Sequence, residues 1–239
     1  MKDQKYYLSL FEKILVKCQI ILKDTKPKKT SVKKKELKIN LDYKLNKAII
    51  KELRKTKIDI ISEENSNISN LSILKNKKNY WIVDPLDGSL NFLRNIPFCS
   101  ICISLVLNGK FEISLIYDIN KNDKYIAYNN KIFVNGIKKN FSRKIFNKKS
   151  SILVTGFPHE FNFKKKLIDF KKYNKTRMIG CASLSMLGCM KGNFDWYQEK
   201  NIMLWDVAAG YHFNIINNCI VRKFDKNKII QEVSLGYCK

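Results

Sequence analysis

Hydrophobic residues near the N-terminus recur every three to four positions, the spacing that places them on one face of a helix. Two such runs predict amphipathic helices over residues 4–23 and 40–56. The Lys-rich stretch 23–38 between them contains Pro27 and has no apolar face, so we interpret it as a mobile basic loop.

The middle of the chain changes to shorter apolar runs that are bounded by Asn and Gly, a pattern typical of strands. The runs 98–107 and 111–118 flank Asn108-Gly109, a dipeptide that favours a two-residue turn and therefore predicts a hairpin. Further strands are predicted at residues 58–61, 80–83, 124–128 and 131–134.

The last third of the chain alternates strand patterns with helix patterns. Strands are predicted at 151–155, 177–179 and 194–197, and helices at 160–172, 182–191 and 206–217. This alternation favours an α/β layer. The sequence therefore predicts an α/β protein with two parts, an α+β N-terminal half over residues 1–145 and an α/β C-terminal half over residues 146–239.

Composition and charge narrow the possible partners. The formal net charge of the 239 residues is +25, which normally indicates an anionic partner. However, only five of the 46 basic residues are Arg, the side chain that reads bases and phosphates with a bidentate fork, so we expect nucleic acid not to be the main partner. No apolar run approaches 18 residues and no secretory signal is visible, so we expect a cytoplasmic protein with no membrane partner.

The seven cysteines are an odd number, and because we expect an intracellular protein, we expect them to be free thiols. Cys99 and Cys102 form a CxxC motif, which in other proteins carries redox chemistry. Here the motif lies in a predicted strand, where residues three apart point to opposite faces. We therefore interpret these two cysteines as buried thiols rather than a redox pair.

The segment that follows the strand at 80–83 contains the most informative chemistry. The strand ends at Asp84, and a turn allows Asp87 to face the same point, so two carboxylates and the backbone carbonyl between them form an oxygen-rich site. Such ligands suit Mg²⁺ rather than zinc. Gly88-Ser89 then opens a short helix, whose free N–H groups favour phosphate. A magnesium site beside a phosphate site predicts phosphate-ester chemistry.

Other acidic residues also stand beside apolar segments. Glu63 and Glu64 end the strand at 58–61, and Asp206 stands between apolar residues at the start of a predicted helix. Unpaired carboxylates in such surroundings are costly, so a metal ion or a helix cap should satisfy them. For Asp206 taken alone, a cap and a metal ligand are both consistent with the sequence.

The residues WIVDPLDGSLNF at 81–92 and WDVAAG at 205–210 resemble the two signatures of the inositol monophosphatase family, which are Mg²⁺-dependent and lithium-sensitive phosphatases. Two further stretches, Gly180–Ser183 and Asp195–Glu199, correspond to the family's G-[ST]-A-A and D-x-[YF]-x-E patterns. The resemblance covers about residues 40–220. It implies a layered αβαβα sandwich of the inositol monophosphatase and sugar phosphatase type.

The resemblance also implies roles for individual residues. The expected ligands of two to three Mg²⁺ ions are Glu63, Asp84, the Leu86 carbonyl, Asp87 and Asp206. The expected catalytic residues are Glu63, Asp84, Asp87 and Ser89, with Asp42 as the partner of Ser89. The expected substrate contacts are Gly88, Ser89, Ala182 and Glu199.

The implied reaction is hydrolysis of an inositol or sugar monophosphate by attack of a metal-activated water. The Ser before Glu63 resembles the 3′(2′),5′-bisphosphate nucleotidase branch, which is the enzymatic alternative. A third interpretation is a regulatory relative that binds RNA or protein with weak catalysis. A homodimer is also consistent with the resemblance, and the 23–38 loop is either a solvated basic segment or a contact to a second phosphate.

The chain departs from the family pattern after the second signature. Ile216–Cys219 replaces the common E-A-G-G stretch, and 33 residues follow Asp206. The sequence therefore predicts that the final helix and strand are shortened or missing. Because no expected metal ligand is lost, both full and weakened activity are consistent with this change.

Overall fold

The computed structural model describes most of the chain, over residues 3–25, 34–65, 74, 78–141, 146–156 and 172–238. The predicted helix at 160–172 lies outside the described residues except for its last position, and so does the centre of the predicted basic loop. No helix in the described part is long and apolar enough to span a membrane.

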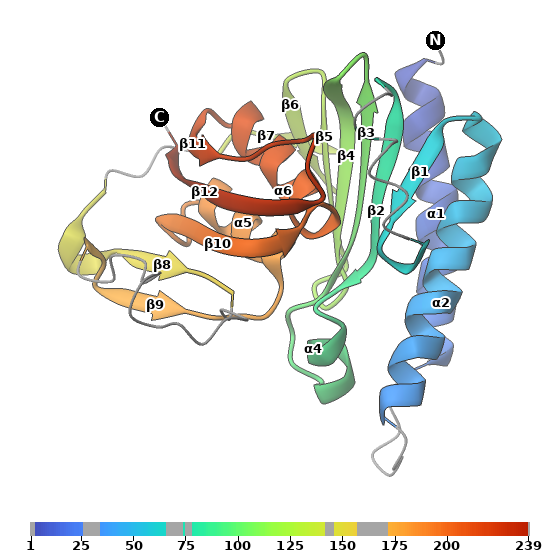
Figure 1. Cartoon of the computed structure of the whole chain (residues 1–239), viewed down its shortest axis with the longest axis horizontal. Coiled ribbons are helices and arrows are strands. Elements are labelled where there is room, and N and C mark those ends of the chain that lie inside the picture. The colour runs from blue at the N-terminus through green and yellow to red at the C-terminus, as the bar shows by residue number, and fades with distance from the viewer. Residues whose placement is uncertain are drawn as a thin grey trace.

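A seven-stranded sheet forms the centre of the molecule, and its strands follow one another in chain order (Figure 1). The first two strands are parallel and the remaining neighbours are antiparallel. The strands are β1 (Asp59–Ser62), β2 (Tyr80–Asp87), β3 (Ser100–Leu107), β4 (Lys110–Asp118), β5 (Asp123–Tyr128), β6 (Lys131–Val134) and β7 (Ile137–Lys139). The predicted hairpin is confirmed, since Asn108 and Gly109 both have positive φ at the β3–β4 turn.

Two long helices, α1 (Gln4–Asp24) and α2 (Lys34–Leu53), cover one face of this sheet (Figure 1). Their buried faces have the predicted helical spacing and pack on the strands as one continuous core. Trp81 of β2 lies at the centre of this core, with the rings of Tyr7 and Phe11 against it edge to face at 5.8 and 6.1 Å. Because α2 begins at Lys34, it starts six residues earlier than the sequence pattern indicates.

The opposite face of the sheet packs on α5 (Ala182–Met190) and α6 (Leu204–Ile216). These two helices lie between the first sheet and a second sheet, so the described layers are helices, sheet, helices and sheet (Figure 1). The second sheet has the order β11-β12-β10-β8-β9. Its strands are β8 (Ile152–Val154), β9 (Lys175–Arg177), β10 (Trp196–Met203), β11 (Cys219–Lys223) and β12 (Ile230–Cys238).

The predicted fold class is confirmed. In the second sheet, the strand expected at 177–179 is β9, which ends at Arg177. Strands β11 and β12 follow α6, and β12 is nine residues long. That the C-terminal end is shortened relative to the family stays a prediction. The remaining helical segments in the described part of the chain are short: α4 (Ser89–Arg94), η1 (Arg54–Thr56), η2 (Glu63–Asn65) and η4 (Lys148–Ser150).

The CxxC cysteines diverge as predicted. Cys99 is buried in the core between the first sheet and α1 and α2, whereas Cys102 is buried in the core beneath α5 and α6. Cys18, Cys99 and Cys102 are free thiols, as are Cys181 and Cys189. The prediction that every cysteine is free is wrong for Cys219, which is disulfide-bonded. Its strand pairs with β12, a strand that the sequence pattern did not predict, so no partner for Cys219 could be foreseen.

The close approach of α5 and α6 depends on a glycine. A Cβ on Gly210 would lie 2.7 Å from the Cβ of Met186, an atom that cannot move without moving α5. We expect Gly210→Ala to lower the free energy of unfolding by about 1–2 kcal/mol, because the clash outweighs the better helix propensity of Ala. Chemical denaturation measures this difference. Equal or greater stability of the variant would show that the two helices can separate at no cost.

Candidate functional site

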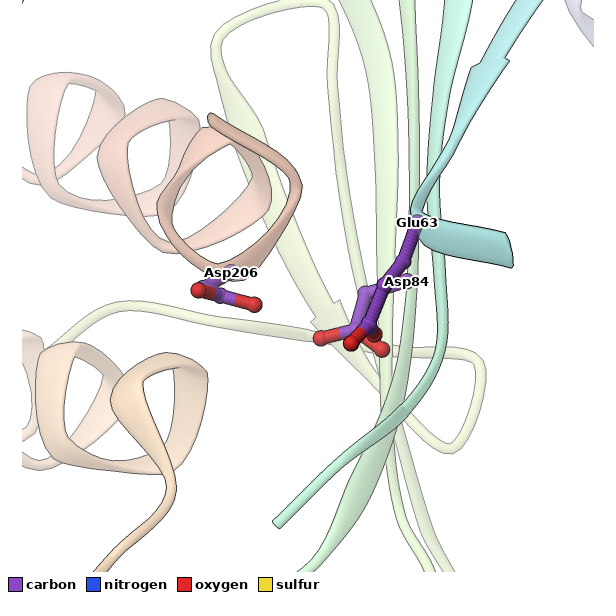
Figure 2. Close-up of side chains that lie close together, drawn as sticks. All are labelled: Glu63, Asp84 and Asp206. Atoms are coloured by element: carbon purple, nitrogen blue, oxygen red, sulfur yellow. The ribbon is translucent and has the colours of Figure 1, made fainter. Parts of the chain in front are cut away.

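Three carboxylates from distant parts of the chain meet at one end of the first sheet (Figure 2). Glu63 and Asp84 are neighbours because β1 and β2 are parallel, with Ser62 in register with Val83. Glu63 directly follows β1 as the first residue of η2, and Asp84 is the next residue of β2. Asp206 reaches the same point from the first turn of α6. Each of the three side chains offers one carboxylate oxygen that lies within 4.8 Å of the others.

The environment of Asp84 and Asp206 disfavours their negative charge. Asp84 is 1% exposed, and its Oδ1 accepts a hydrogen bond of 2.9 Å from the Leu86 N–H. Burial, followed by the charge of Asp206, raises the pKa of Asp84 well above its usual range. Burial, followed by the charges of Asp87 and Glu63, does the same to the pKa of Asp206. Like charges thus converge in a site where they repel each other.

The cluster has the properties of a divalent cation site. Oδ2 of Asp84 is buried and has no hydrogen-bond partner among the described residues. A buried acceptor without a donor is rare in folded proteins and requires an explanation. A hard cation such as Mg²⁺ takes oxygen ligands of this kind and would neutralise the converging charges. Asp206 also accepts the Met203 N–H at 3.3 Å, so it caps α6 as well as facing the cluster.

Asp87 has different partners from the other three acids. Its carboxylate lies at the N-terminus of α5, where Oδ2 accepts the Ser183 N–H at 2.8 Å and the Ser183 hydroxyl at 2.5 Å. The N–H of Ala182 approaches Oδ1 at 3.3 Å. Burial raises the pKa of Asp87, and the Ser183 hydrogen bonds oppose that rise. Asp87 is not part of the three-carboxylate cluster, so its role as a metal ligand stays a prediction.

The acids line a cleft of about 270 Å³ between the first sheet, α5 and β10. Gly88 lies on its wall with φ of 81°, and a Cβ there would lie 2.5 Å from the Phe98 carbonyl oxygen, so the turn into α4 requires glycine. The cleft brings together nine of the ten residues that the sequence singles out: Glu63, Asp84, Leu86, Asp87, Gly88, Ser89, Ala182, Glu199 and Asp206.

Asp42 is the exception. It is buried on α2 and does not line the cleft, although α2 packs against α4, which begins at Ser89. The pairing of Asp42 with Ser89 therefore stays a prediction.

The far end of the cleft contains an unusual carboxyl group. Burial raises the pKa of Glu199 to about 7, although its Oε2 accepts a hydrogen bond of 2.6 Å from the Tyr197 hydroxyl. Gly156 lies directly beside it, and a Cβ at that position would collide with the Glu199 carboxylate. Thr155, Gly156 and Asn201 also line the cleft and were not among the predicted site residues. A glycine directly after the predicted strand at 151–155 was the available signal for Gly156.

Comparisons with known proteins identify the family of this chain. The sequence model of the inositol monophosphatase family matches residues 7–213. The chain belongs to the inositol monophosphatase family. The matched range includes all ten predicted site residues, and the fold and the acidic cleft are therefore those of a member of this family.

Individual relatives agree with this assignment. The chain is 31% identical over 184 residues to a protein named Nus factor SuhB from Pasteurella multocida, a match that covers 72% of this chain and 66% of that protein. The matched region thus spans just under two thirds of that relative. A crystal structure of the extragenic suppressor protein suhB from Bartonella henselae has a TM-score of 0.77 at 24% identity, covering 97% of this chain and 93% of that one. Inositol monophosphatase II from Staphylococcus aureus has a TM-score of 0.78 at 19% identity, covering 97% and 91%.

The three-carboxylate cluster makes a prediction about stability. We expect Mg²⁺ to raise the melting temperature of the wild-type protein, because a ligand at 100 times its Kd stabilises the folded state by about 2.7 kcal/mol. Asp84→Asn should abolish this rise, and without divalent ions at pH 8 it should be more stable than the wild type because one buried charge is gone. Thermal denaturation with and without Mg²⁺ measures both effects. The control is Glu64→Gln, which removes an exposed acid next to the cluster. An equal Mg²⁺ response of Asp84→Asn and the control would contradict the assignment.

The raised pKa of Glu199 predicts a pH dependence. The folded protein keeps this proton up to about pH 7, whereas the ordinary Glu pKa is 4.5, so the proton stabilises the folded state at low pH and this contribution is lost as the pH rises through 7. Glu199→Gln lacks the effect. We expect its free energy of unfolding, relative to that of the wild type, to increase by about 2–3 kcal/mol between pH 4.5 and pH 8. Urea denaturation in buffers without divalent ions tests this, and a constant difference across the range would refute it.

Proposed function

We propose that this protein is a Mg²⁺-dependent phosphomonoester hydrolase that acts on inositol or sugar monophosphates. The observation that carries the proposal is the convergence of Glu63, Asp84 and Asp206 on a point where a buried Asp84 oxygen has no hydrogen-bond donor. Membership of the inositol monophosphatase family supports the same reaction.

The three converging carboxylates would hold the first Mg²⁺ ion, and the Leu86 carbonyl and Asp87 are the further ligands proposed for a second and third ion. When bound, the ions supply Lewis-acid activation of water and neutralise charge on the phosphoryl group. The chain would hold these ions in fixed positions, because Glu63 directly follows β1, Asp84 and Asp87 belong to β2, and Asp206 lies in the first turn of α6.

The residues of the chain would bind the phosphate and move the proton. Gly88 and Ser89 lie at the start of α4, where backbone N–H groups have no partner within the helix and favour an anion. Glu63 is the most exposed of the three carboxylates, and in this role it accepts a proton from the attacking water. Ser89, assisted by Asp42, orients the same water.

The other end of the cleft would bind the alcohol part of the substrate. With a pKa near 7, Glu199 is partly protonated at neutral pH and can accept or donate a hydrogen bond to a sugar hydroxyl. Ala182 lies on the neighbouring wall. Solved structures of SaIMPase-II, which has this fold, contain bound inositol monophosphate or 2′AMP, so the fold accommodates both a cyclitol and a nucleotide monoester. The second ligand supports the 3′(2′),5′-bisphosphate nucleotidase as the enzymatic alternative.

A second candidate function is a regulatory one, in which the chain binds RNA or a protein and catalyses little. It is favoured by the name Nus factor that the curated relatives carry and by the net charge of +25. Such binding would not need the carboxylates of the cleft. Its dependence on salt would be steep if the partner were a nucleic acid.

Phosphate release from a panel of substrates separates these functions. The panel contains inositol 1-phosphate, fructose 1,6-bisphosphate, histidinol phosphate and adenosine 3′,5′-bisphosphate, each with and without Mg²⁺ and Li⁺. We expect Mg²⁺-dependent, Li⁺-inhibited hydrolysis of inositol 1-phosphate or a sugar phosphate, and a loss of at least about a hundredfold in Asp84→Asn, because its charge on the ion is gone. Glu64→Gln should retain the activity.

The possible results distinguish the candidates. Preferred hydrolysis of the adenosine bisphosphate would establish the nucleotidase instead. Full activity of Asp84→Asn would refute the metal-dependent mechanism. The absence of turnover on every substrate, by a folded protein that Mg²⁺ still stabilises, would favour the regulatory function.

A further inference from the structure

The two carboxylate oxygens of Asp87 accept different numbers of hydrogen bonds. Oδ2 accepts three hydrogen bonds, from the N–H of Ser183 at 2.8 Å, from its hydroxyl at 2.5 Å and from the Cys181 thiol at 3.1 Å. Oδ1 accepts one long bond of 3.3 Å from Ala182 N–H. A carboxylate oxygen has two lone-pair directions, so Oδ2 is fully used and Oδ1 keeps the capacity to bind a cation.

The Ser183 hydroxyl belongs to a directed chain of hydrogen bonds. Its oxygen lies 2.6 Å from the hydroxyl oxygen of Ser100 on β3, and both side chains are completely buried. A hydroxyl has one proton to donate, and Ser183 donates its proton to the ionised Asp87, which can only accept. Ser100 must therefore donate to Ser183. The hydrogen bond of 2.5 Å to Asp87 has the length of a charge-assisted bond between a hydroxyl and a carboxylate.

The position of this hydroxyl differs from the family pattern. G-[ST]-A-A has its hydroxyl residue at the position of Cys181 and an alanine at the position of Ser183. A thiol is a weak donor, so the substitution of Cys for Ser or Thr at 181 weakens one contact to Asp87. Ser183 supplies a hydroxyl two residues later, and it reaches the same Oδ2 atom.

We propose that Ser183, supported by Ser100, is a positioning residue that fixes the Asp87 carboxylate on α5 through Oδ2 and leaves Oδ1 as the ligand atom for a divalent cation. The proposal rests on the function proposed above, in which Asp87 is a metal ligand. Hydrogen bonds that orient a ligating carboxylate commonly change metal affinity by ten- to a hundredfold. Ser183 thus acts through Asp87 and does not itself line the cleft.

Titration of the full-length protein with Mn²⁺, followed by the EPR signal of the free ion, tests this role without any substrate. We expect Ser183→Ala to raise the Kd of at least one Mn²⁺ site by about tenfold. Ser100→Ala should cause a smaller loss at the same site, and the double variant should lose no more than Ser183→Ala, because Ser100 acts only through Ser183. Moving the hydroxyl back, in Cys181→Ser/Ser183→Ala, should restore most of the affinity.

The matched control is Ser104→Ala. Ser104 is also a buried serine of β3, and its hydroxyl pairs with that of Ser114 at 2.8 Å instead of with the Asp87 network. This variant should bind Mn²⁺ like the wild type, so a loss seen in Ser183→Ala alone is not a general effect of removing a buried serine pair.

Three results would overturn the proposal. Unchanged or tighter Mn²⁺ binding by Ser183→Ala would show that the hydroxyl does not position Asp87. A loss that Cys181→Ser fails to rescue would assign the effect to packing. A wild-type protein that binds no Mn²⁺ would refute the proposed metal-dependent function together with this inference, whereas the first two results refute this inference alone. If Ser183→Ala does not fold, Ser100→Ala decides: weaker binding supports the chain of hydrogen bonds and unchanged binding overturns it.

Discussion

The repulsion between buried carboxylates is the constraint on which the rest of this structure depends. Oxygens of Glu63, Asp84 and Asp206 converge to within 4.8 Å, and burial disfavours the charge of Asp84 and Asp206. The N–H groups of Leu86 and Met203 compensate for only part of this cost. The fold must therefore hold the three side chains in place by packing elsewhere, and a cation must supply the opposite charge for the cluster to be favourable.

The layered architecture provides that rigidity. The parallel pairing of β1 with β2 places two of the acids at adjacent strand ends, and the buried aromatic core around Trp81 anchors β2 against α1. On the opposite side, α5 and α6 pack between the two sheets. This packing fixes the positions of their N-termini at the cleft. Asp87 bridges the two sides, since it ends β2 and caps α5. The cleft is therefore formed where elements of both sheets meet.

Local patterns in the sequence predicted much of this arrangement. Helical spacing identified α1, and the Asn108-Gly109 turn identified the β3–β4 hairpin, because both signals arise from neighbouring residues. Asp84, Asp87 and Asp206 were identified because a charged side chain beside apolar segments is costly unless a metal ion or a helix cap compensates for it. What the sequence could not show depends on contacts between distant residues. The pairing of β11 with β12 and the disulfide bond of Cys219 belong to this class, as does the contact of Gly156 with Glu199.

Anomalous X-ray scattering from Mn²⁺-soaked crystals shows directly whether a divalent cation lies between the three carboxylates. We expect a strong anomalous peak within bonding distance of oxygens from Glu63, Asp84 and Asp206. Anomalous Mn²⁺ peaks at other sites, with none between these three side chains, would contradict the proposed cation site. The same result would leave the buried Asp84 oxygen without a partner and the cluster without a function.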